Sequence, residues 1–289
     1  MSRIAVLYPG GLGAVLGRAI VRAGDTAITC LSGRSEATCA RALNSGFVVV
    51  PSLEEVVRRS EIVISLVPAA AALETAHRFA CSLESVHTEM PPIFVDANSV
   101  APRTKLRVAE ILAAKQVPCI DGAFFGPTNE LGKNNLLALS GPDTARIAQL
   151  LEKAVEVRQL GPSVGQASAL KMALTILTKA LPALFLEIVC ASGTRDQLNS
   201  VLEMMRRLYP GIIGFLERTI PTYPVYAERR KCELEEAASW LHEADQSGYM
   251  TLSAVKVLRR FQLAALEPSS KWSFDNLLNR IADSQMLHV

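Results

Sequence analysis

Short apolar segments alternate with amphipathic ones over the first half of the chain. An apolar run at residues 3–8 precedes a glycine-rich turn, and residues 13–24 have the spacing of a helix that Gly24 ends. Ser52 and Glu55 form a capping box at the start of another predicted helix. Further predicted strands cover 27–31, 47–50, 61–67, 91–98, 117–124 and 135–141, and further predicted helices cover 35–46 and 52–60. Apolar strands alternating with helices predict a parallel sheet that is covered on both faces.

The pattern becomes helical after Gly161. Residues 163–193 are a long apolar helical run that Pro182 is expected to kink or divide, and residues 228–244 form a second predicted helix. Breaks are expected at 209–215 and 219–225. The predicted fold class is therefore α/β, with an N-terminal Rossmann-like, doubly wound parallel sheet followed by an all-α C-terminal domain. The domain boundary is expected near 161–165, which gives a dinucleotide-binding domain at 1–162 and a helical substrate and dimerisation domain at 163–289.

Composition and charge narrow the class of partner. Of the 289 residues 49% are apolar and 20% are charged, which is typical of a folded protein, and a net charge of +2 is too small for a nucleic-acid-binding surface. Six scattered cysteines lack metal-ligand spacing, so no metal site is expected. No signal peptide and no uninterrupted apolar run of about eighteen residues is evident. These features predict a cytoplasmic protein that binds small molecules, with no membrane partner.

The glycine-rich turn predicts a dinucleotide site. Gly11, Gly13 and Gly17 nearly match the G-x-G-x-x-G fingerprint, although Leu16 stands where the third glycine is expected. A lone match could be only a turn, but this one follows a strand and opens a helix, the context in which backbone amides bind a pyrophosphate. Gly17 could then provide the close helix–strand packing of the third glycine. The predicted contacts at this turn are Gly11, Leu12, Gly13 and Ala14.

The end of the second predicted strand favours NADP over NAD. An acidic residue is expected there when the site binds the ribose hydroxyls of NAD. This chain instead has Ser32, Arg34 and Ser35, and a guanidinium can bind a 2′-phosphate with two hydrogen bonds. The alternative is that Arg34 is only a solvated residue at the mouth of a helix.

An ordered set of motifs resembles the 6-phosphogluconate and β-hydroxyacid dehydrogenase superfamily, and within it the branch with a distinctive 6-phosphogluconate-dehydrogenase-like C-terminal domain. The set comprises the glycine turn, LVP at 66–68, DANSVAP at 96–102, DGAFFGP at 121–127 and a lysine on the first long helix. The resemblance implies cofactor contacts at Val67, Pro68, Asn98 and Ser99. It also implies that the helical domain forms much of a homodimer contact and that substrate binds between the domains.

Lys171 corresponds to the catalytic lysine of that superfamily. Ser168, Lys171, Thr175 and Thr178 recur at helical intervals and draw one polar stripe on an apolar helix. The stripe could face a cleft or, alternatively, solvent. A lysine ammonium can donate a proton to the oxygen of a carbonyl that receives a hydride, and it acts in reverse during oxidation. Lys171, Ser168 and Thr175 are therefore the catalytic candidates.

Two departures from the superfamily affect the expected substrate. Phe125, Gly126 and Pro127 stand where a serine and two glycines usually hold a substrate carboxylate, and the asparagine that usually follows the lysine is absent, with Thr175 as a partial replacement. The expectation is an NADP-dependent dehydrogenase or reductase acting on a carbonyl or alcohol that is bulkier and less polar than a small hydroxyacid. An NADPH-dependent imine reductase and a non-catalytic NADPH-binding or sensing protein remain the alternatives.

Overall fold

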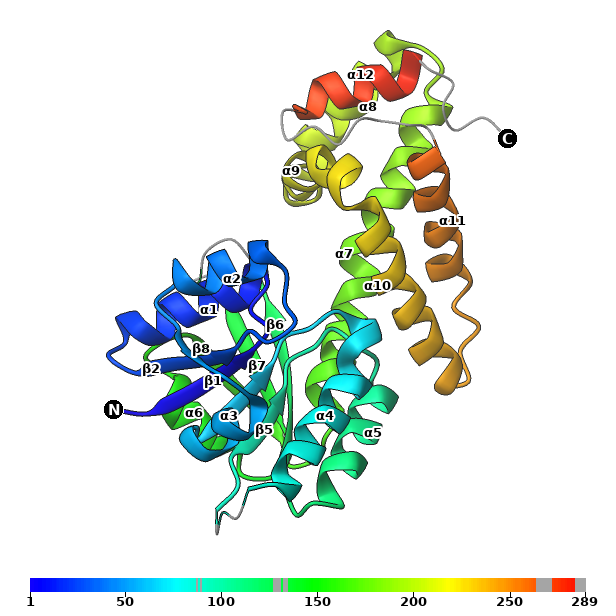
Figure 1. Ribbon diagram of the computed structural model, residues 1–289. Coiled ribbons are helices and arrows are strands. Elements are labelled where there is room, and N and C mark those ends of the chain that lie inside the picture. Colours follow the sequence, from blue (N-terminus) through cyan, green and yellow to red (C-terminus); the bar gives the residue numbers. More distant parts are fainter. Residues whose placement is uncertain (87, 89, 127–130, 132–134, 264–271, 284–289) are drawn as a thin grey trace. The chain divides into compact units, whose positions relative to one another are not determined.

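The computed structural model describes residues 1–86, 88, 90–126, 131, 135–263 and 272–283. Within these residues, eight strands form one sheet in the order β3-β2-β1-β4-β5-β6-β7-β8 (Figure 1). The strands are β1 Arg3–Leu7, β2 Thr26–Cys30, β3 Val48–Val50, β4 Ile62–Ser65, β5 Ile93–Asp96, β6 Cys119–Phe125, β7 Leu136–Ser140 and β8 Glu156–Gly161. This order places β1 beside β4 at the centre, with the chain winding outward in both directions. The predicted fold class is confirmed.

Helices cover both faces of the sheet. The first unit contains α1 Gly11–Arg22, α2 Glu36–Leu43, α3 Leu53–Arg59, η1 Ala69–Ala71, α4 Ala72–Glu84, α5 Pro102–Ala113 and α6 Thr144–Leu151. One buried cluster joins the strands to α1, α2 and α6, and a second joins them to α3, α4 and α5. The predicted capping box opens α3, where Ser52 Oγ accepts a hydrogen bond from the Glu55 amide. The inner strands are thus apolar on both faces, as the sequence pattern predicts for a covered parallel sheet, whereas the edge strands β3 and β8 are largely exposed.

The last two strands differ from the prediction. β7 runs antiparallel to β6, whereas the other neighbouring pairs are parallel. Only residues 126–135 connect β6 to β7, which is too short for the crossover that a parallel pair requires. β8 was not predicted because Glu156, Arg158 and Gln159 are polar, and its place at the edge of the sheet leaves these residues partly or fully exposed.

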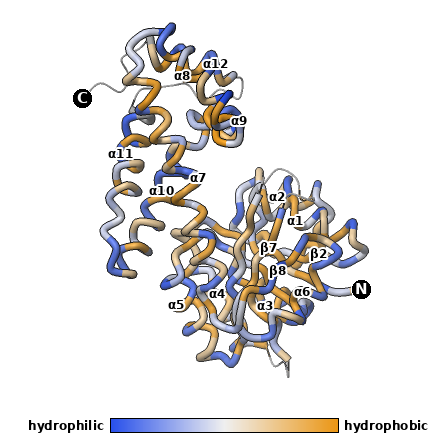
Figure 2. The backbone as a smooth tube through the Cα atoms, turned by 180° about the vertical axis from the view of Figure 1, so that it is seen from behind, coloured by the Kyte–Doolittle hydropathy of each residue, from blue (hydrophilic) through white to orange (hydrophobic). Residues whose placement is uncertain are grey.

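The helical part of the chain has its own core. The chain divides into two compact units, Met1–Lys171 and Met172–Val289, and α7 (Gln166–Ala191) contains the point of division. The remaining helices are α8 Arg195–Leu208, α9 Pro210–Thr219, η2 Ile220–Thr222, α10 Tyr223–Glu243, α11 Tyr249–Leu263 and α12 Phe274–Asp283. Their buried core includes Phe185, Leu216, Tyr223, Leu258 and Leu277. Figure 2 shows hydrophobic positions along α7.

The described prolines of this part of the chain lie within its helices or in their first turns, and Pro182 does not divide α7. Pro182 lies inside α7, and the helix continues through it to Ala191. A break between helices does fall in each segment where one was expected, at Tyr209 between α8 and α9 and at η2 between α9 and α10. Both breaks are shorter than the predicted 209–215 and 219–225, because Pro210 begins α9 and Pro224 lies in the first turn of α10. The first turn of a helix has no intrahelical acceptor for its amide hydrogens, so proline is tolerated there.

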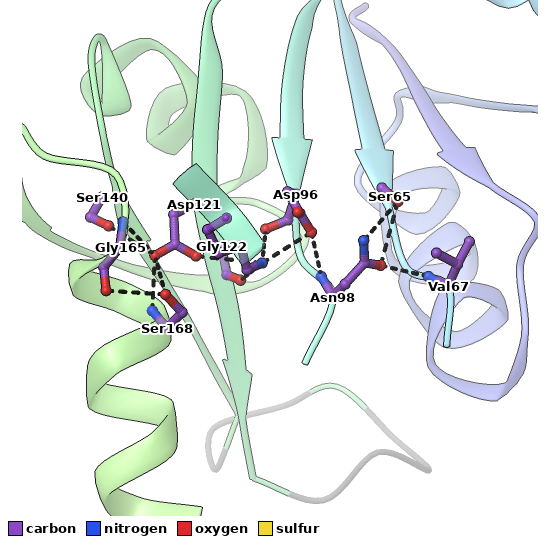
Figure 3. Close-up of polar contacts among 10 residues, drawn as sticks. Ser65, Val67, Asp96, Asn98, Asp121, Gly122, Ser140, Gly165 and Ser168 are labelled. Carbon is purple, nitrogen blue, oxygen red and sulfur yellow. Dashed lines mark hydrogen bonds and ion pairs between the residues drawn. The ribbon is translucent and has the colours of Figure 1, made fainter. Parts of the chain in front are cut away.

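A fully buried lysine, Lys105, pairs with two carboxylates of neighbouring strands. Figure 3 shows these carboxylates, Asp96 and Asp121, side by side on β5 and β6. Lys105, on α5, has its Nζ atom 3.0 Å from Asp96 Oδ1 at the end of β5 and 3.4 Å from Asp121 Oδ1 in β6. Nζ also donates to the backbone carbonyl oxygens of Asp96 and Gly122. One ammonium therefore ties two neighbouring strands and a helix together.

Lys105 keeps its positive charge at neutral pH. Burial alone lowers the pKa of the Lys105 ammonium, but the carboxylates of Asp96 and Asp121 outweigh burial, so its pKa is raised above its ordinary value. A raised pKa in the folded state means that Lys105 stabilises the fold fully at pH values below the ordinary lysine value of 10.5. That stabilisation is lost only as the pH rises above this value and the ammonium loses its proton.

We expect Lys105→Met to lower the free energy of unfolding by about 3–5 kcal/mol, because it leaves two buried carboxylates without their cation. Urea unfolding measures this loss. Lys115→Met is the matched control, since Lys115 makes an exposed ion pair with Glu84 and should be nearly neutral. The difference between wild type and Lys105→Met should stay constant from neutral pH to about pH 10 and shrink above it. A stability loss no larger than that of Lys115→Met would contradict the assigned role.

Candidate functional site

The glycine turn lies between β1 and α1, but in a different frame from the prediction. α1 begins at Gly11, and Gly10 is its N-cap. The fingerprint therefore reads Tyr8-x-Gly10-x-x-Gly13, with tyrosine in the place of the first glycine. Tyr8 has a φ of 52°, the left-handed conformation for which glycine is usually selected.

The glycines of this turn differ in the space that surrounds them. A Cβ atom on Gly13 would lie 3.2 Å from the Cβ of Pro9 and 3.3 Å from a methyl of Val6, so Gly13 permits the close approach of helix and strand. Gly17, for which that role was predicted, also permits close packing of α1, but against the Phe47 ring and not against β1. Nothing lies within 4 Å of a Cβ built on Gly10 or on Gly11. The backbone at the start of α1 is thus open to a ligand.

The other predicted cofactor contacts near this turn differ in their exposure and in their hydrogen bonds. Leu12 packs partly buried against the core, and Ala14 is buried. Ser35 is the N-cap of α2, where its hydroxyl accepts from the Thr38 amide. Ser32 is exposed after β2, and the Arg34 guanidinium lies 4.3 Å from the centroid of the Tyr8 ring. The turn after β1 and the segment after β2 therefore meet at Tyr8 and Arg34.

Asn98 holds the turn after β4. Its Oδ1 atom accepts from the Val67 amide at 2.7 Å, and its Nδ2 donates to Ser65 Oγ at 3.1 Å. The backbone N–H of Asn98 in turn donates to Asp96 Oδ1, which also pairs with Lys105. Asn98 is buried, Pro68 is exposed and Ser99 is partly buried. The turn that carries Val67 and Pro68 is thereby connected to the buried ion cluster.

Asp121 connects the same cluster to the first turn of α7. Its Oδ2 atom accepts from the Ser168 amide and from the Ser168 hydroxyl, both at 2.9 Å, and from the Gly165 amide at 3.1 Å. The Ser140 hydroxyl on β7 also donates to this oxygen. A carboxylate is stabilised at a helix N-terminus, because the backbone N–H groups there lack intrahelical acceptors and can donate to it. The start of α7 is therefore fixed against the sheet.

Lys171 lies one turn after Ser168 and reaches the end of β6. Its Nζ atom donates to the Phe124 carbonyl oxygen at 2.6 Å and lies 5.0 Å from the centroid of the Phe125 ring. Ser168 and Thr175 are each 2% exposed, so a solvent-facing stripe is excluded at these two positions. Gly126 is exposed with a φ of 94°. Pro127 lies outside the described residues.

Tyr8 and Lys105 are among the residues at this edge that the sequence did not indicate. Lysine is rarely fully buried, so no pattern in the segment 102–113 points to a charge cluster. Tyr8 could have been found by placing the fingerprint directly after the last apolar strand residue, Leu7. In the part of the chain that the structure describes, no three side chains of His, Cys, Asp or Glu gather as a metal site.

Comparisons with known proteins agree with this arrangement. The model of the NAD binding domain of 6-phosphogluconate dehydrogenase matches residues 3–161. An uncharacterized 28.5 kDa protein of Methanothermus fervidus is 29% identical over 177 residues, which is 61% of this chain and 66% of that protein. The chain therefore spans just under two thirds of the length of that relative.

Two solved structures extend the likeness over both units. The conserved protein MTH1747, of unknown function and similar in structure to 3-hydroxyacid dehydrogenases, has a TM-score of 0.72 at 24% identity and covers 90% of this chain and 96% of its own. The 3-hydroxyisobutyrate dehydrogenase of Mycobacterium tuberculosis, solved with L-serine, has a TM-score of 0.74 at 16% identity, over 97% of this chain and 99% of its own. The fold is that of the 3-hydroxyacid dehydrogenases. The chain belongs to the family defined by the NAD-binding domain of 6-phosphogluconate dehydrogenase, within the superfamily that its motifs predict.

Proposed function

We propose that this protein is an NADP-dependent oxidoreductase that interconverts a carbonyl and an alcohol, with Lys171 as general acid and base. The observation that carries the proposal is the position of the Lys171 ammonium, 2.6 Å from the Phe124 carbonyl oxygen at the carboxyl end of β6. In open α/β sheets, ligands bind outside the carboxyl ends of the strands. Lys171 therefore places a proton donor at the edge where a reacting carbonyl would bind.

The residues at this edge fit a dinucleotide. Gly10 and Gly11 leave the start of α1 without side chains, so its amides are available to a pyrophosphate. The turn carrying Val67 and Pro68, held by Asn98, would contact the nicotinamide half. At the other end, Ser32, Arg34 and Ser35 favour a 2′-phosphate because none of them carries the carboxylate that would repel it. A bound nicotinamide cofactor supplies or accepts the hydride.

Lys171 transfers the proton in the proposed reaction. In the reductive direction, the Nζ ammonium gives a proton to the carbonyl oxygen while the carbon receives the hydride. In the oxidative direction, neutral Nζ removes the hydroxyl proton as the hydride leaves the carbon. The Phe124 carbonyl oxygen accepts one N–H of the ammonium and thereby orients Nζ.

Ser168 and Thr175 support Lys171 in different ways. The Ser168 hydroxyl and amide both donate to Asp121, which favours a positioning role at the first turn of α7. Thr175 follows Lys171 by one helical turn and remains the candidate for a substrate contact. The Phe125 ring lies beside the ammonium and would give the substrate site an aromatic wall. This composition favours a bulky, weakly polar carbonyl over a small hydroxyacid.

We expect Lys171→Met to reduce turnover by about a hundredfold or more while folding and NADPH binding are retained, because the general acid is lost. Oxidation of NADPH measures this against a panel of aldehydes, keto acids and cyclic imines. Lys153→Met, at an exposed lysine of the same unit, is the control. Turnover near the wild-type rate in Lys171→Met would eliminate the proposed role. Turnover of imines alone would instead support an imine reductase, and NADPH binding without any turnover would support a sensing protein.

We also propose that the protein is a homodimer that covers part of α7. Leu174, Leu177, Leu184 and Ile188 are exposed to between 38% and 60% on this helix. α7 is long and apolar enough to cross a membrane by length and composition. Its first turn is nevertheless anchored to the buried Asp121, which favours a protein partner over lipid. Exposed apolar surface of this extent is typical of an interface.

Light scattering at micromolar concentration should therefore give about twice the 31.2 kDa mass of one chain. Leu177→Glu should shift the protein toward monomer, because a charge would be buried in the interface. Leu43→Glu is the matched control, since Leu43 is 63% exposed on α2 and Leu177 is 60% exposed on α7. A monomeric wild-type protein would contradict the assembly.

A further inference from the structure

Two arginines from distant parts of the chain converge on the ring of Tyr8. The guanidinium carbon of Arg34, which follows β2, lies 4.3 Å from the ring centroid, and that of Arg78, on α4, lies 5.8 Å from it. Tyr8 itself is only 8% exposed and has the left-handed backbone conformation. Three segments, the turn after β1, the segment after β2 and helix α4, thus bring two positive charges to one place.

Two buried polar atoms of this cluster have no hydrogen-bond partner among the described residues. The Tyr8 hydroxyl and the Arg34 Nε atom are buried, and neither has a hydrogen-bond partner among the described residues. Over the same residues, no carboxylate forms an ion pair with Arg34 or Arg78. Buried polar groups are normally satisfied, and like charges held close together repel one another. An anion bound between the two guanidinium groups would relieve both costs.

A cavity of about 570 Å³ lies beside the cluster. Ser32, His77 and Arg78 contribute to its wall, together with Cys30 at the end of β2. The adenosine ribose of a dinucleotide binds near the end of the second strand of this fold. The cavity is large enough for an adenosine moiety, and its cationic side is formed by Arg78.

We propose that Arg78 and Tyr8 complete, with Arg34, a binding site for the 2′-phosphate of NADPH. A phosphate monoester carries close to two negative charges at neutral pH, which two guanidinium groups can neutralise. The Tyr8 hydroxyl donates a third hydrogen bond to a phosphate oxygen. The inference rests on the proposed function, because it assumes that this edge binds a nicotinamide dinucleotide.

The protonation of Tyr8 suits this role. Burial raises the pKa of the Tyr8 phenol, and the neighbouring Arg78 and Arg34 charges offset only part of that rise. The phenol therefore keeps its proton at neutral pH and acts as a hydrogen-bond donor. Glu54 and Glu74 also line the cavity. Because neither forms an ion pair with Arg34 or Arg78, the two guanidinium charges are available to an anion.

Titration of NADPH and NADH into wild type, Arg78→Ala and Tyr8→Phe tests the proposal without any substrate. Arg78→Ala should raise the Kd for NADPH by about tenfold or more and leave that for NADH nearly unchanged, because NADH lacks the phosphate. Tyr8→Phe should raise the Kd for NADPH by about two- to tenfold. Arg107→Ala is the control, since Arg107 is exposed on α5 and lies outside the cluster. Adenosine 2′-monophosphate should show the same order of affinities among the variants.

The outcomes separate this inference from the proposed function. Binding of both cofactors by wild type, with Arg78→Ala weakening both equally or neither, would overturn the role of Arg78 and leave dinucleotide binding intact. A wild-type preference for NADH would do the same. Failure of wild type to bind either cofactor would overturn the proposed function and this inference together.

Discussion

Lys105 is the buried charge on which the carboxyl edge of the sheet depends. Its ammonium lies between Asp96 and Asp121, so β5 and β6 cannot separate at this pair of residues without leaving unpaired charges in the interior. Hydrogen bonds extend from this centre in two directions. Through Asn98 they reach the turn after β4, and through Asp121 they reach the first turn of α7. The two elements proposed to meet the nicotinamide and to carry Lys171 are therefore positioned by one network.

This arrangement has a large desolvation free energy, since two carboxylates and one ammonium are taken out of water to hold three elements together. The cluster carries one more negative than positive charge, and Asp96 Oδ2 has no hydrogen-bond partner among the described residues. An apolar cluster of the same volume is often at least as stable. What the charges add is direction, because each carboxylate oxygen fixes the position of particular N–H groups. A site that must orient a hydride acceptor and a proton donor requires that precision.

The sequence predicted the repetitive part of the fold well, because buried parallel strands are apolar runs and the helices between them have caps such as Ser52. It failed where a residue contradicts its usual environment. Lys105 reads as a surface residue of a helix, and nothing local indicates that Asp96 and Asp121 meet it, since that encounter arises only when β5 and β6 pair. β8 was missed because an edge strand can be polar, and the break expected at 209–215 is confined to Tyr209 because Pro210 begins a helix. The role of Lys171 was inferred from a resemblance and its helical spacing, and the structure adds its partner, the Phe124 carbonyl.

Tyr8 shows why the frame of the glycine fingerprint was misjudged and what that substitution implies. A left-handed conformation costs a non-glycine residue about 1–2 kcal/mol, and glycine would remove that cost. Burying the tyrosine ring returns a comparable amount, and a guanidinium over its face adds about 0.5–2 kcal/mol. The fold therefore tolerates tyrosine, yet packing alone gives no reason for a buried hydroxyl that has no partner within the described part of the chain. A strained residue with an unsatisfied donor beside two cations is better explained by a ligand than by stability, because strain of this kind persists where it serves a site.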